Sequence, residues 1–249
     1  MIILDIKQGG ENGDRWHEER HGCVTGTKLE SALGACYSNA KLSWELGGKT
    51  WEFEGNKLVC VKDGKQTKKS FDKQMTLILE LVSDRQSELE ISDYQSAEME
   101  RGCDLEPFSV EAASVKHGVN FVPCGMLVSD TLPRFKFSPD AVCFNENGVV
   151  VGGYETKSKM GKKHIEYQIA NVVPPEHLIQ CLTPMIMDDS VKYWIFGHFD
   201  DRNKVNNLFT TGIKRADYED FIQVAREVLG KFLGEVELKV KEMGGEYNA

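Results

Sequence analysis

The chain has 249 residues and a formal net charge of −9, with 41% hydrophobic and 28% charged residues. These values are typical of a globular protein and exclude a disordered or fibrous chain. The length fits one large domain, so we expect a single domain over residues 1–249. The longest apolar runs fall short of the ~18 residues of a transmembrane helix, and "MIILDIKQGG" is too short for a secretory signal. We therefore expect a cytoplasmic protein without a membrane partner.

The seven cysteines are odd in number and scattered, and none is paired as CxxC. This pattern argues against a disulfide framework, a zinc site and an iron–sulfur cluster. The cysteines are Cys23, Cys36, Cys60, Cys103, Cys124, Cys143 and Cys181.

The negative net charge counts against nucleic-acid binding, which depends on Lys and Arg, but the basic residues are unevenly distributed. "TKSKMGKK" (156–163) concentrates four lysines, and residues 41–73 contain eight lysines against five acidic residues. Either run could be an ordinary solvated face or part of a basic groove on an acidic protein.

The N-terminal half predicts short helices around a β-meander. Thr25 or Thr27 is expected to cap a helix in "KLESALG", with Glu30 completing a capping box. Residues 44–70 alternate apolar and polar side chains around "EGNK" and "KDGK", which predicts a hairpin or meander inserted at the surface. Helical periodicity follows over 71–83.

A second helical stretch covers 93–118, and Pro107 within it suits the first turn of a new helix better than a helix interior. Strands are then predicted over 121–129, 134–144 and 148–158, the last two joined by the turn sequence "NENG".

Residues 176–187 read as a helix, 191–199 as a strand buried on both faces, and 206–214 as an edge strand. From Tyr218 onward, apolar residues recur every three or four positions, which predicts an amphipathic helix. The order of these elements predicts one mixed α/β domain.

"FSPDAV" (137–142) and "YETKSK" (154–159) carry the candidate chemistry. Residues two apart on a strand share a face, so Glu155 and Lys157 should point to the same side and Thr156 to the other. If the hairpin closes around "NENG", Asp140 lies at the same end. Two carboxylates with open oxygens suit Mg²⁺, and a lysine beside them could hold or deprotonate a water or stabilise charge on a phosphate.

The same residues could instead form a surface Glu/Lys pair with an unrelated Asp in a turn. The valine-rich run before Glu155 favours a site, because charges at the end of a buried strand are costly unless they are paired or bind metal.

The chain resembles the lambda-exonuclease-like viral recombinases, a branch of the PD-(D/E)xK nucleases. "WHEERHGCVTGT" (16–27) looks like the family's W-H-x-x-R-x-G-x-x-T-x-S block, and "RGCDLEP" (101–107) looks like its G-x-x-x-E helix. "SPDA" and "ETK" match the core. Residues 177–202 resemble the segment in which a glutamine helix precedes an aromatic strand. The resemblance implies a restriction-endonuclease-like core, a central mixed sheet flanked by helices, with 44–70 as an inserted hairpin.

The resemblance also implies roles for individual residues. Lys157 would position the nucleophilic water, and Gln180 would support it or contact DNA, with Gln168 as a rival. The residues expected around Mg²⁺, for which Mn²⁺ would substitute, are Glu106, Asp140, Glu155 and the carbonyl of Thr156.

A terminal 5′ phosphate would be held by a guanidinium and hydroxyls, here Arg20, Thr25 and Thr27. Thr27 stands where the family has serine, and His177 stands where it has tyrosine three residues before the glutamine. The remaining residues expected to bind DNA are Lys159, Lys162 and Lys163.

The implied function is a Mg²⁺-dependent 5′-to-3′ exonuclease of a phage or prophage, which digests double-stranded DNA ends to leave 3′ tails for strand annealing. The family implies a ring-shaped trimer, whose channel could collect lysines while acidic residues cover the outside, and a possible single-strand annealing partner. Two alternatives remain open: an endonuclease with the same core, and a catalytically idle DNA-binding assembly protein.

Overall fold

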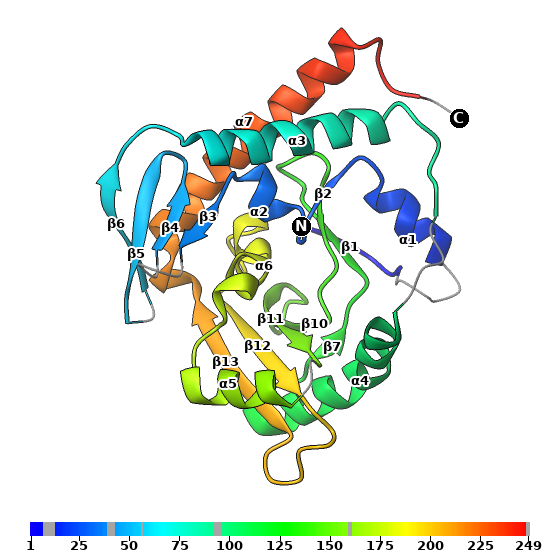
Figure 1. Ribbon diagram of the computed structural model, residues 1–249. Helices are drawn as coiled ribbons and strands as arrows, with labels where there is room; N and C mark the ends of the chain where they lie inside the picture. Colours follow the sequence, from blue (N-terminus) through cyan, green and yellow to red (C-terminus); the bar gives the residue numbers. More distant parts are fainter. Residues whose placement is uncertain (7–12, 39–42, 56, 92–95, 159–160, 248–249) are drawn as a thin grey trace.

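A five-stranded mixed sheet, called the central sheet below, lies in the lower half of the molecule as drawn in Figure 1. The computed structural model describes residues 1–6, 13–38, 43–55, 57–91, 96–158 and 161–247. In the order β13-β12-β11-β10-β7, β11 and β12 pair in parallel and the other neighbours pair antiparallel. The strands are β7 (Val122–Pro123), β10 (Ala141–Phe144), β11 (Val150–Lys157), β12 (Tyr193–Phe199) and β13 (Leu208–Lys214).

Strand β11 is the middle strand of the central sheet, and its residues before Glu155 are valines, glycines and a tyrosine. Its glycines let aromatic rings of β12 lie directly on it: a Cβ on Gly152 would lie 2.6 Å from the ring of Tyr193. Side chains larger than glycine there would separate the two strands. The charged residues of the strand, Glu155 and Lys157, lie at its C-terminal end.

Two smaller sheets complete the β structure. The first has the order β1-β8-β9-β2 and the second β3-β4-β5-β6. Their strands are β1 (Ile2–Leu4), β2 (Val24–Thr25), β3 (Cys36–Ser38), β4 (Ser43–Leu46), β5 (Lys49–Glu54), β6 (Lys57–Asp63), β8 (Met126–Val128) and β9 (Phe135–Phe137).

The helices cover both faces of the central sheet. Helix α4 packs on one face, while α5 and α6 pack on the other and α6 also contacts α7. They are α1 (Gly13–Arg20), α2 (Leu29–Ala32), α3 (Lys68–Asp84), α4 (Ala97–His117), α5 (Lys162–Ala170), α6 (Pro175–Met187) and α7 (Glu219–Glu242), with a 3₁₀ turn at Arg215–Asp217. Within the described ranges, no helix combines the length and the apolar character needed to span a bilayer.

The mixed α/β architecture and several predicted elements are confirmed. Helix α6, the buried strand β12, the edge strand β13 and the amphipathic helix α7 lie where the periodicity places them. The "NENG" turn joins β10 to β11 in an antiparallel hairpin.

Four local predictions were wrong. Pro107 lies inside α4, which runs unbroken from the Ser96 cap to Gly118, because a proline removes only one of the many backbone bonds of such a helix. Helix α2 starts after Lys28 without a side-chain cap, so the capping box at Thr27 does not form. The predicted strand over 134–144 is split at 138–140, and its halves β9 and β10 join different sheets. The predicted strand over 121–129 is likewise split at 124–125 into β7 and β8, which also join different sheets.

The predicted meander of 44–70 forms, but it is part of the core. Strands β3 to β6 form a meander in which each strand pairs antiparallel with the next, and β6 ends at Asp63. Trp44 and Trp51 are only 1% and 2% exposed, and the ring of Trp51 packs edge-on against Phe221 of α7 at 5.3 Å. The meander is therefore held by apolar contacts and does not project freely from the surface.

Trp51→Ala should lower the free energy of unfolding by about 3 to 5 kcal/mol, because it leaves a large cavity against α7. Urea unfolding followed by circular dichroism measures this. Val61→Ala in the same sheet is the control, since Val61 is 49% exposed and its truncation should cost less than about 1 kcal/mol. Equal effects of the two changes would mean that the meander does not contribute to the core.

Candidate functional site

The end of β11 carries a buried carboxylate with two donors on one oxygen. Glu155 is 1% exposed, and its Oε1 accepts a hydrogen bond from Lys157 Nζ at 2.6 Å. Gln180 Nε2 on α6 donates to the same oxygen at 2.5 Å. Glu155 and Lys157 thus share a face of the strand as their spacing predicts, and α6 supplies the third side chain.

Asp140 lies at the same end of the sheet, directly before β10. Its Oδ2 accepts a hydrogen bond from the backbone N–H of Thr156 at 2.6 Å. The antiparallel pairing of β10 with β11 explains this proximity, because it sets Ala141 opposite Tyr154. The hairpin therefore brings Asp140 beside the Glu155–Lys157 pair, as the "NENG" turn predicts.

The opposite face of β11 is bonded to α4. Ser109 Oγ lies 2.7 Å from the Tyr154 hydroxyl and 2.6 Å from Thr156 Oγ1, and Ser109 is fully buried. Glu106 is three residues earlier on the same helix, and its negative charge adds to the rise in the pKa of Glu155. These bonds hold α4, and with it Glu106, against the strand that carries the site.

Burial is the main electrostatic influence on the pair. It raises the pKa of Glu155 to about 8, helped by the charge of Asp140 and opposed by Lys157. Burial alone would lower the pKa of Lys157, but the carboxylates of Glu155 and Asp140 outweigh it and raise that pKa. Lys157 is therefore a persistent cation, whereas Glu155 can exchange a proton near neutral pH.

One oxygen of the site is suited to a cation. Glu155 Oε2 is buried and has no hydrogen-bond partner among the described residues, a costly arrangement that a bound metal ion would relieve. Oxygen donors of this kind fit Mg²⁺, which usually binds one or two carboxylates and keeps several waters. Among the residues that the structure describes, however, no three His, Cys, Asp or Glu side chains already stand in a metal-binding cluster.

The block at the front of the chain lies next to the segment that leads to Asp140. Arg20 ends α1, and its guanidinium lies 4.1 Å from the centre of the Trp16 ring. Trp16 Nε1 in turn donates to Ser138 Oγ at 3.0 Å, two residues before Asp140. Burial lowers the pKa of Arg20, which indicates a partly desolvated guanidinium.

The two threonines of this block lie on the short strand β2 and the loop after it. Thr25 is buried, Thr27 is exposed, and their hydroxyls are 3.2 Å apart. Strand β2 pairs with β9, and a Cβ on Gly26 would lie 2.6 Å from the ring of Phe137. This close packing holds the threonines beside the strand that runs into "SPDA".

His177 and Gln180 lie beside the end of β11, whereas Gln168 bonds elsewhere. His177 is buried and stacks on Phe196 at 5.1 Å, and Phe196 pairs with Glu155 across the sheet. Gln168 donates to the carbonyl of Asn206 at 3.2 Å, so Gln180 is the glutamine in contact with Glu155.

The predicted DNA-binding lysines lie on and before α5. Lys162 and Lys163 are exposed at its start and share Glu166, at 3.5 and 2.8 Å. Lys159 falls outside the described residues.

The sequence did not reveal the residues that brace the chain after Lys157. Arg101 on α4 donates to the carbonyl of Ser158 at 2.7 Å and pairs with Asp200 at 3.5 Å. Asp200, directly after β12, also accepts from the backbone N–H of Gly161 at 3.1 Å. A local sequence pattern does not signal these contacts, because they join segments that are far apart in the chain.

Residues 15–190 match the model of the YqaJ-like viral recombinase domain. The chain belongs to this family. Its fold is also that of an alkaline exonuclease, LHK-Exo from Laribacter hongkongensis, with a TM-score of 0.64 at 19% identity over 92% of this chain and 95% of that one. LHK-Exo in complex with dAMP gives a TM-score of 0.64 at 20% identity over the same shares.

A phage-related exonuclease from Haemophilus somnus 129PT is more distant, with a TM-score of 0.50 at 12% identity over 92% of this chain and 99% of that one. No curated protein sequence matches the chain. The family model spans the front block, Glu106, the two core motifs and Gln180, so all the residues of the candidate site lie within the matched region.

Glu155→Gln should change the pH dependence of stability of this recombinase-family protein in buffer with EDTA. The pKa of Glu155 rises from 4.5 to about 8 on folding, so the wild-type protein loses stability as the pH rises between these values. The variant lacks this loss. The free energy of unfolding of the variant minus that of the wild-type protein should rise by a few kcal/mol between pH 5 and pH 8.5, because each pKa unit corresponds to about 1.4 kcal/mol. Urea unfolding at the two pH values measures this difference. A pH-independent difference would contradict the raised pKa.

Proposed function

We propose that this protein is a Mg²⁺-dependent exodeoxyribonuclease that digests one strand of linear double-stranded DNA from the 5′ end. The observation that carries the proposal is the group of Asp140, Glu155, Lys157 and Gln180 at the end of the central strand, where one buried carboxylate oxygen lacks a partner among the described residues. Membership of a viral recombinase family and the fold of an alkaline exonuclease support it. The dAMP bound by LHK-Exo is a nucleotide of the kind such a reaction releases.

In the proposed reaction, Asp140 and Glu155 would hold Mg²⁺, with Glu106 and the carbonyl of Thr156 as further ligands, and Mn²⁺ could take its place. The ion would polarise the scissile phosphate and lower the pKa of a bound water. Lys157, a cation by virtue of its two carboxylate neighbours, would orient the attacking water and stabilise charge on the phosphate. Gln180 would keep the Glu155 carboxylate in place. The water oxygen would form a bond to phosphorus while the bond from phosphorus to one ester oxygen breaks, and that oxygen would leave as a hydroxyl carrying a proton that originates from the water.

The polarity of digestion follows from a proposed 5′ phosphate pocket. Arg20 on the ring of Trp16, with the hydroxyls of Thr25 and Thr27, would bind the terminal phosphate, because a planar guanidinium can donate to two phosphate oxygens at once. His177 would help to form the phosphate pocket. Lys159, Lys162 and Lys163 would contact the phosphates of the DNA backbone. The product would be a duplex with 3′ single-stranded tails, which an annealing protein could bind. The enzyme would act as a ring-shaped trimer in the cytoplasm of a phage host.

Lys157→Ala should reduce digestion of linear duplex DNA in Mg²⁺ by about 10² to 10⁴, because it removes the cation next to the reacting phosphate. Release of acid-soluble nucleotide from labelled DNA measures the rate. Lys192→Ala, which changes an exposed lysine directly before β12, is the control and should digest normally. A wild-type protein that leaves the duplex intact in Mg²⁺ would instead support the idle assembly protein.

Arg20→Ala should abolish the preference for a 5′-phosphorylated end, leaving phosphorylated and unphosphorylated duplexes digested at equal rates. Time courses on matched duplexes compare the two, and the wild-type protein should prefer the phosphorylated one. Arg15→Ala on the same helix is the control, because Arg15 is exposed and outside the proposed pocket. Indifference of the wild-type protein to the phosphate, together with cleavage of circular duplex, would support the endonuclease alternative.

A further inference from the structure

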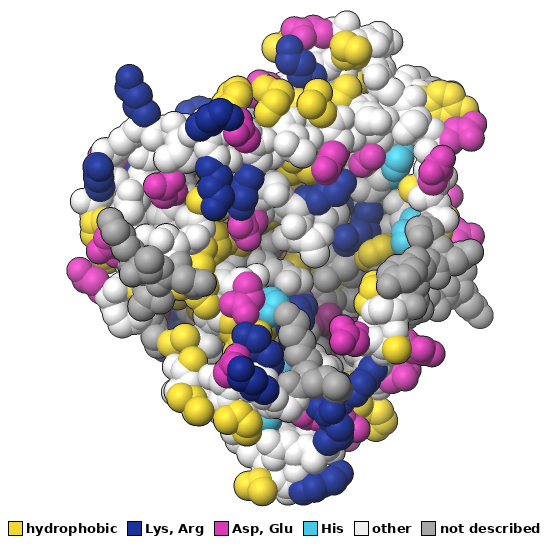
Figure 2. Space-filling model, viewed as in Figure 1, with side chains coloured by type: hydrophobic (Ala, Val, Ile, Leu, Met, Phe, Trp, Pro, Cys, Tyr) yellow, Lys and Arg dark blue, Asp and Glu magenta, His cyan; other side chains and the backbone are white. Residues whose placement is uncertain are grey.

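A basic surface covers β6 and the first turns of α3, away from the carboxylates of the candidate site. In a chain of net charge −9, residues 57–73 contain six lysines and two aspartates. Figure 2 shows Lys side chains gathered over this part of the molecule and again over the start of α5. We call the three exposed residues Lys62, Lys65 and Lys69 the β6–α3 basic surface.

These three lysines differ from their basic neighbours in having no carboxylate partner within the described residues. Lys49, Lys68 and Lys73 are neutralised by Asp63 at 3.6 Å, Asp72 at 2.5 Å and Glu30 at 2.8 Å, respectively. Uncompensated positive charge at three neighbouring positions of an acidic protein creates a local field that attracts anions.

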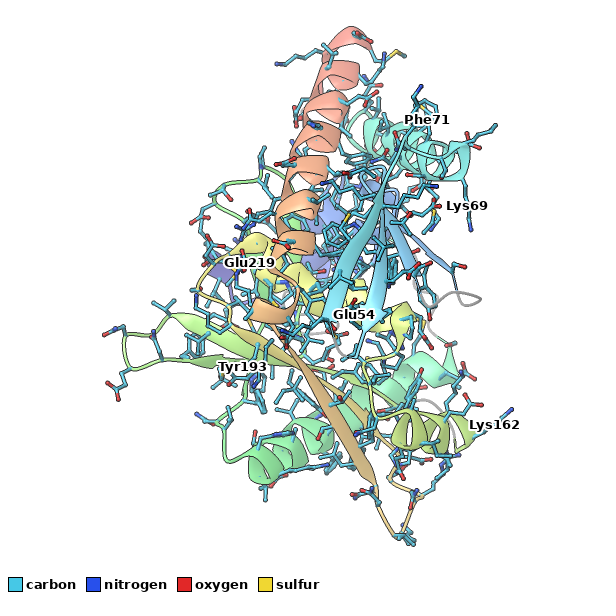
Figure 3. The ribbon with its side chains drawn as sticks, turned by 90° about the vertical axis from the view of Figure 1, so that its left-hand side faces the viewer. Glu54, Lys69, Phe71, Lys162, Tyr193 and Glu219 are labelled. Carbon is cyan, nitrogen blue, oxygen red and sulfur yellow. The ribbon has the colours of Figure 1, made fainter. Side chains whose placement is uncertain are left out.

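Lys69 of the basic surface lies on the same side of the molecule as Lys162 at the start of α5. Figure 3 shows Lys69 on α3 and Lys162 on α5 at the same edge of the molecule. Helix α6, which carries Gln180, lies between α3 and α5 in the view of Figure 1. An extended ligand that passes over α5 and the site would therefore continue towards α3.

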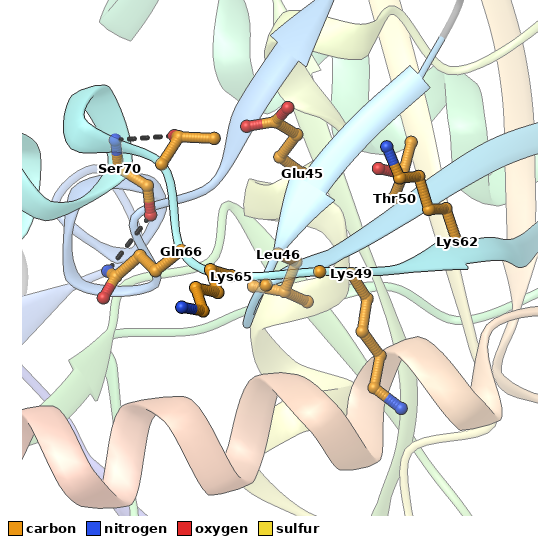
Figure 4. Close-up of a pocket in the computed structure, with 11 residues that line it drawn as sticks. Glu45, Leu46, Lys49, Thr50, Lys62, Lys65, Gln66 and Ser70 are labelled. Carbon is orange, nitrogen blue, oxygen red and sulfur yellow. Dashed lines mark hydrogen bonds between the residues drawn. The ribbon is translucent and has the colours of Figure 1, made fainter.

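The arrangement of the ammonium groups favours an extended polyanion over a single phosphate. Lys62 and Lys65 line a cavity of about 170 Å³ between the meander and α3. Figure 4 shows their side chains pointing in different directions. The first turn of α3, all of it within the described residues, carries no acidic residue, so the positive end of its dipole adds to the same field.

We propose that the β6–α3 basic surface binds the phosphate backbone of double-stranded DNA at a distance from the cleaved end. This inference rests on the proposed function and adds a second binding surface that keeps the duplex on the protein while its end is digested. The chemistry fits DNA better than an acidic protein, because protein interfaces are depleted in lysine, whereas lysines are standard ligands of DNA phosphates.

The test compares wild-type protein with the triple variant Lys62→Glu/Lys65→Glu/Lys69→Glu. Binding of a fluorescein-labelled linear duplex is measured by anisotropy in EDTA, so that cleavage does not enter, over a series of salt concentrations. We expect the variant to bind at least about 10-fold more weakly at low salt. We also expect the slope of log K against log salt to fall by about 0.9 for each DNA phosphate that the variant fails to neutralise.

The matched control is Lys231→Glu/Lys239→Glu/Lys241→Glu on α7, which makes the same change in net charge and should bind nearly as well as wild type. Thermal melts establish that both variants fold. Wild-type affinity and salt slope in the β6–α3 variant, or an equal reduction in both variants, would overturn this inference alone. Failure of the wild-type protein to bind duplex at all would overturn the proposed function as well.

Discussion

The burial of the Glu155 carboxylate is the constraint on which the rest of the site depends. A carboxylate that is 1% exposed is stable only when its surroundings compensate for the lost water. Lys157 from the same strand and Gln180 from α6 supply donors to one oxygen, while the second oxygen has no donor among the described residues. The same desolvation raises the pKa of Glu155, so binding of the proposed metal ion there would be coupled to loss of a proton.

The two faces of β11 divide structural and chemical roles. On the α4 face, the hydroxyls of Ser109, Tyr154 and Thr156 bond to one another in the buried interior. On the α6 face, Glu155 and Lys157 meet Gln180. Because successive residues of a strand point to opposite faces, one short segment anchors a helix and presents charged groups at the same time.

Charge is organised on two length scales in this protein. Within the site, opposite charges lie in contact and are poorly screened because they are buried. On the surface, the net charge of −9 is interrupted by the lysines of the β6–α3 basic surface, which lack carboxylate partners in the described part of the chain. The acidic composition is thus compatible with a DNA substrate if the duplex contacts only the basic surfaces. The acidic faces would repel nucleic acid.

The sequence by itself determined the strand and helix periods, the alternation that pairs Glu155 with Lys157, and the hairpin that brings Asp140 beside them. It wrongly predicted that Pro107 begins a new helix, whereas Pro107 lies inside α4. It also predicted that the meander projects from the surface, because a local pattern does not show that Trp51 packs on Phe221, 170 positions away. Only the tertiary structure shows that Gln180 contacts Glu155 whereas Gln168 bonds to Asn206, and only it links Trp16 to Ser138 and Arg101 to Ser158. These contacts join distant segments, and their geometry depends on how sheets and helices pack.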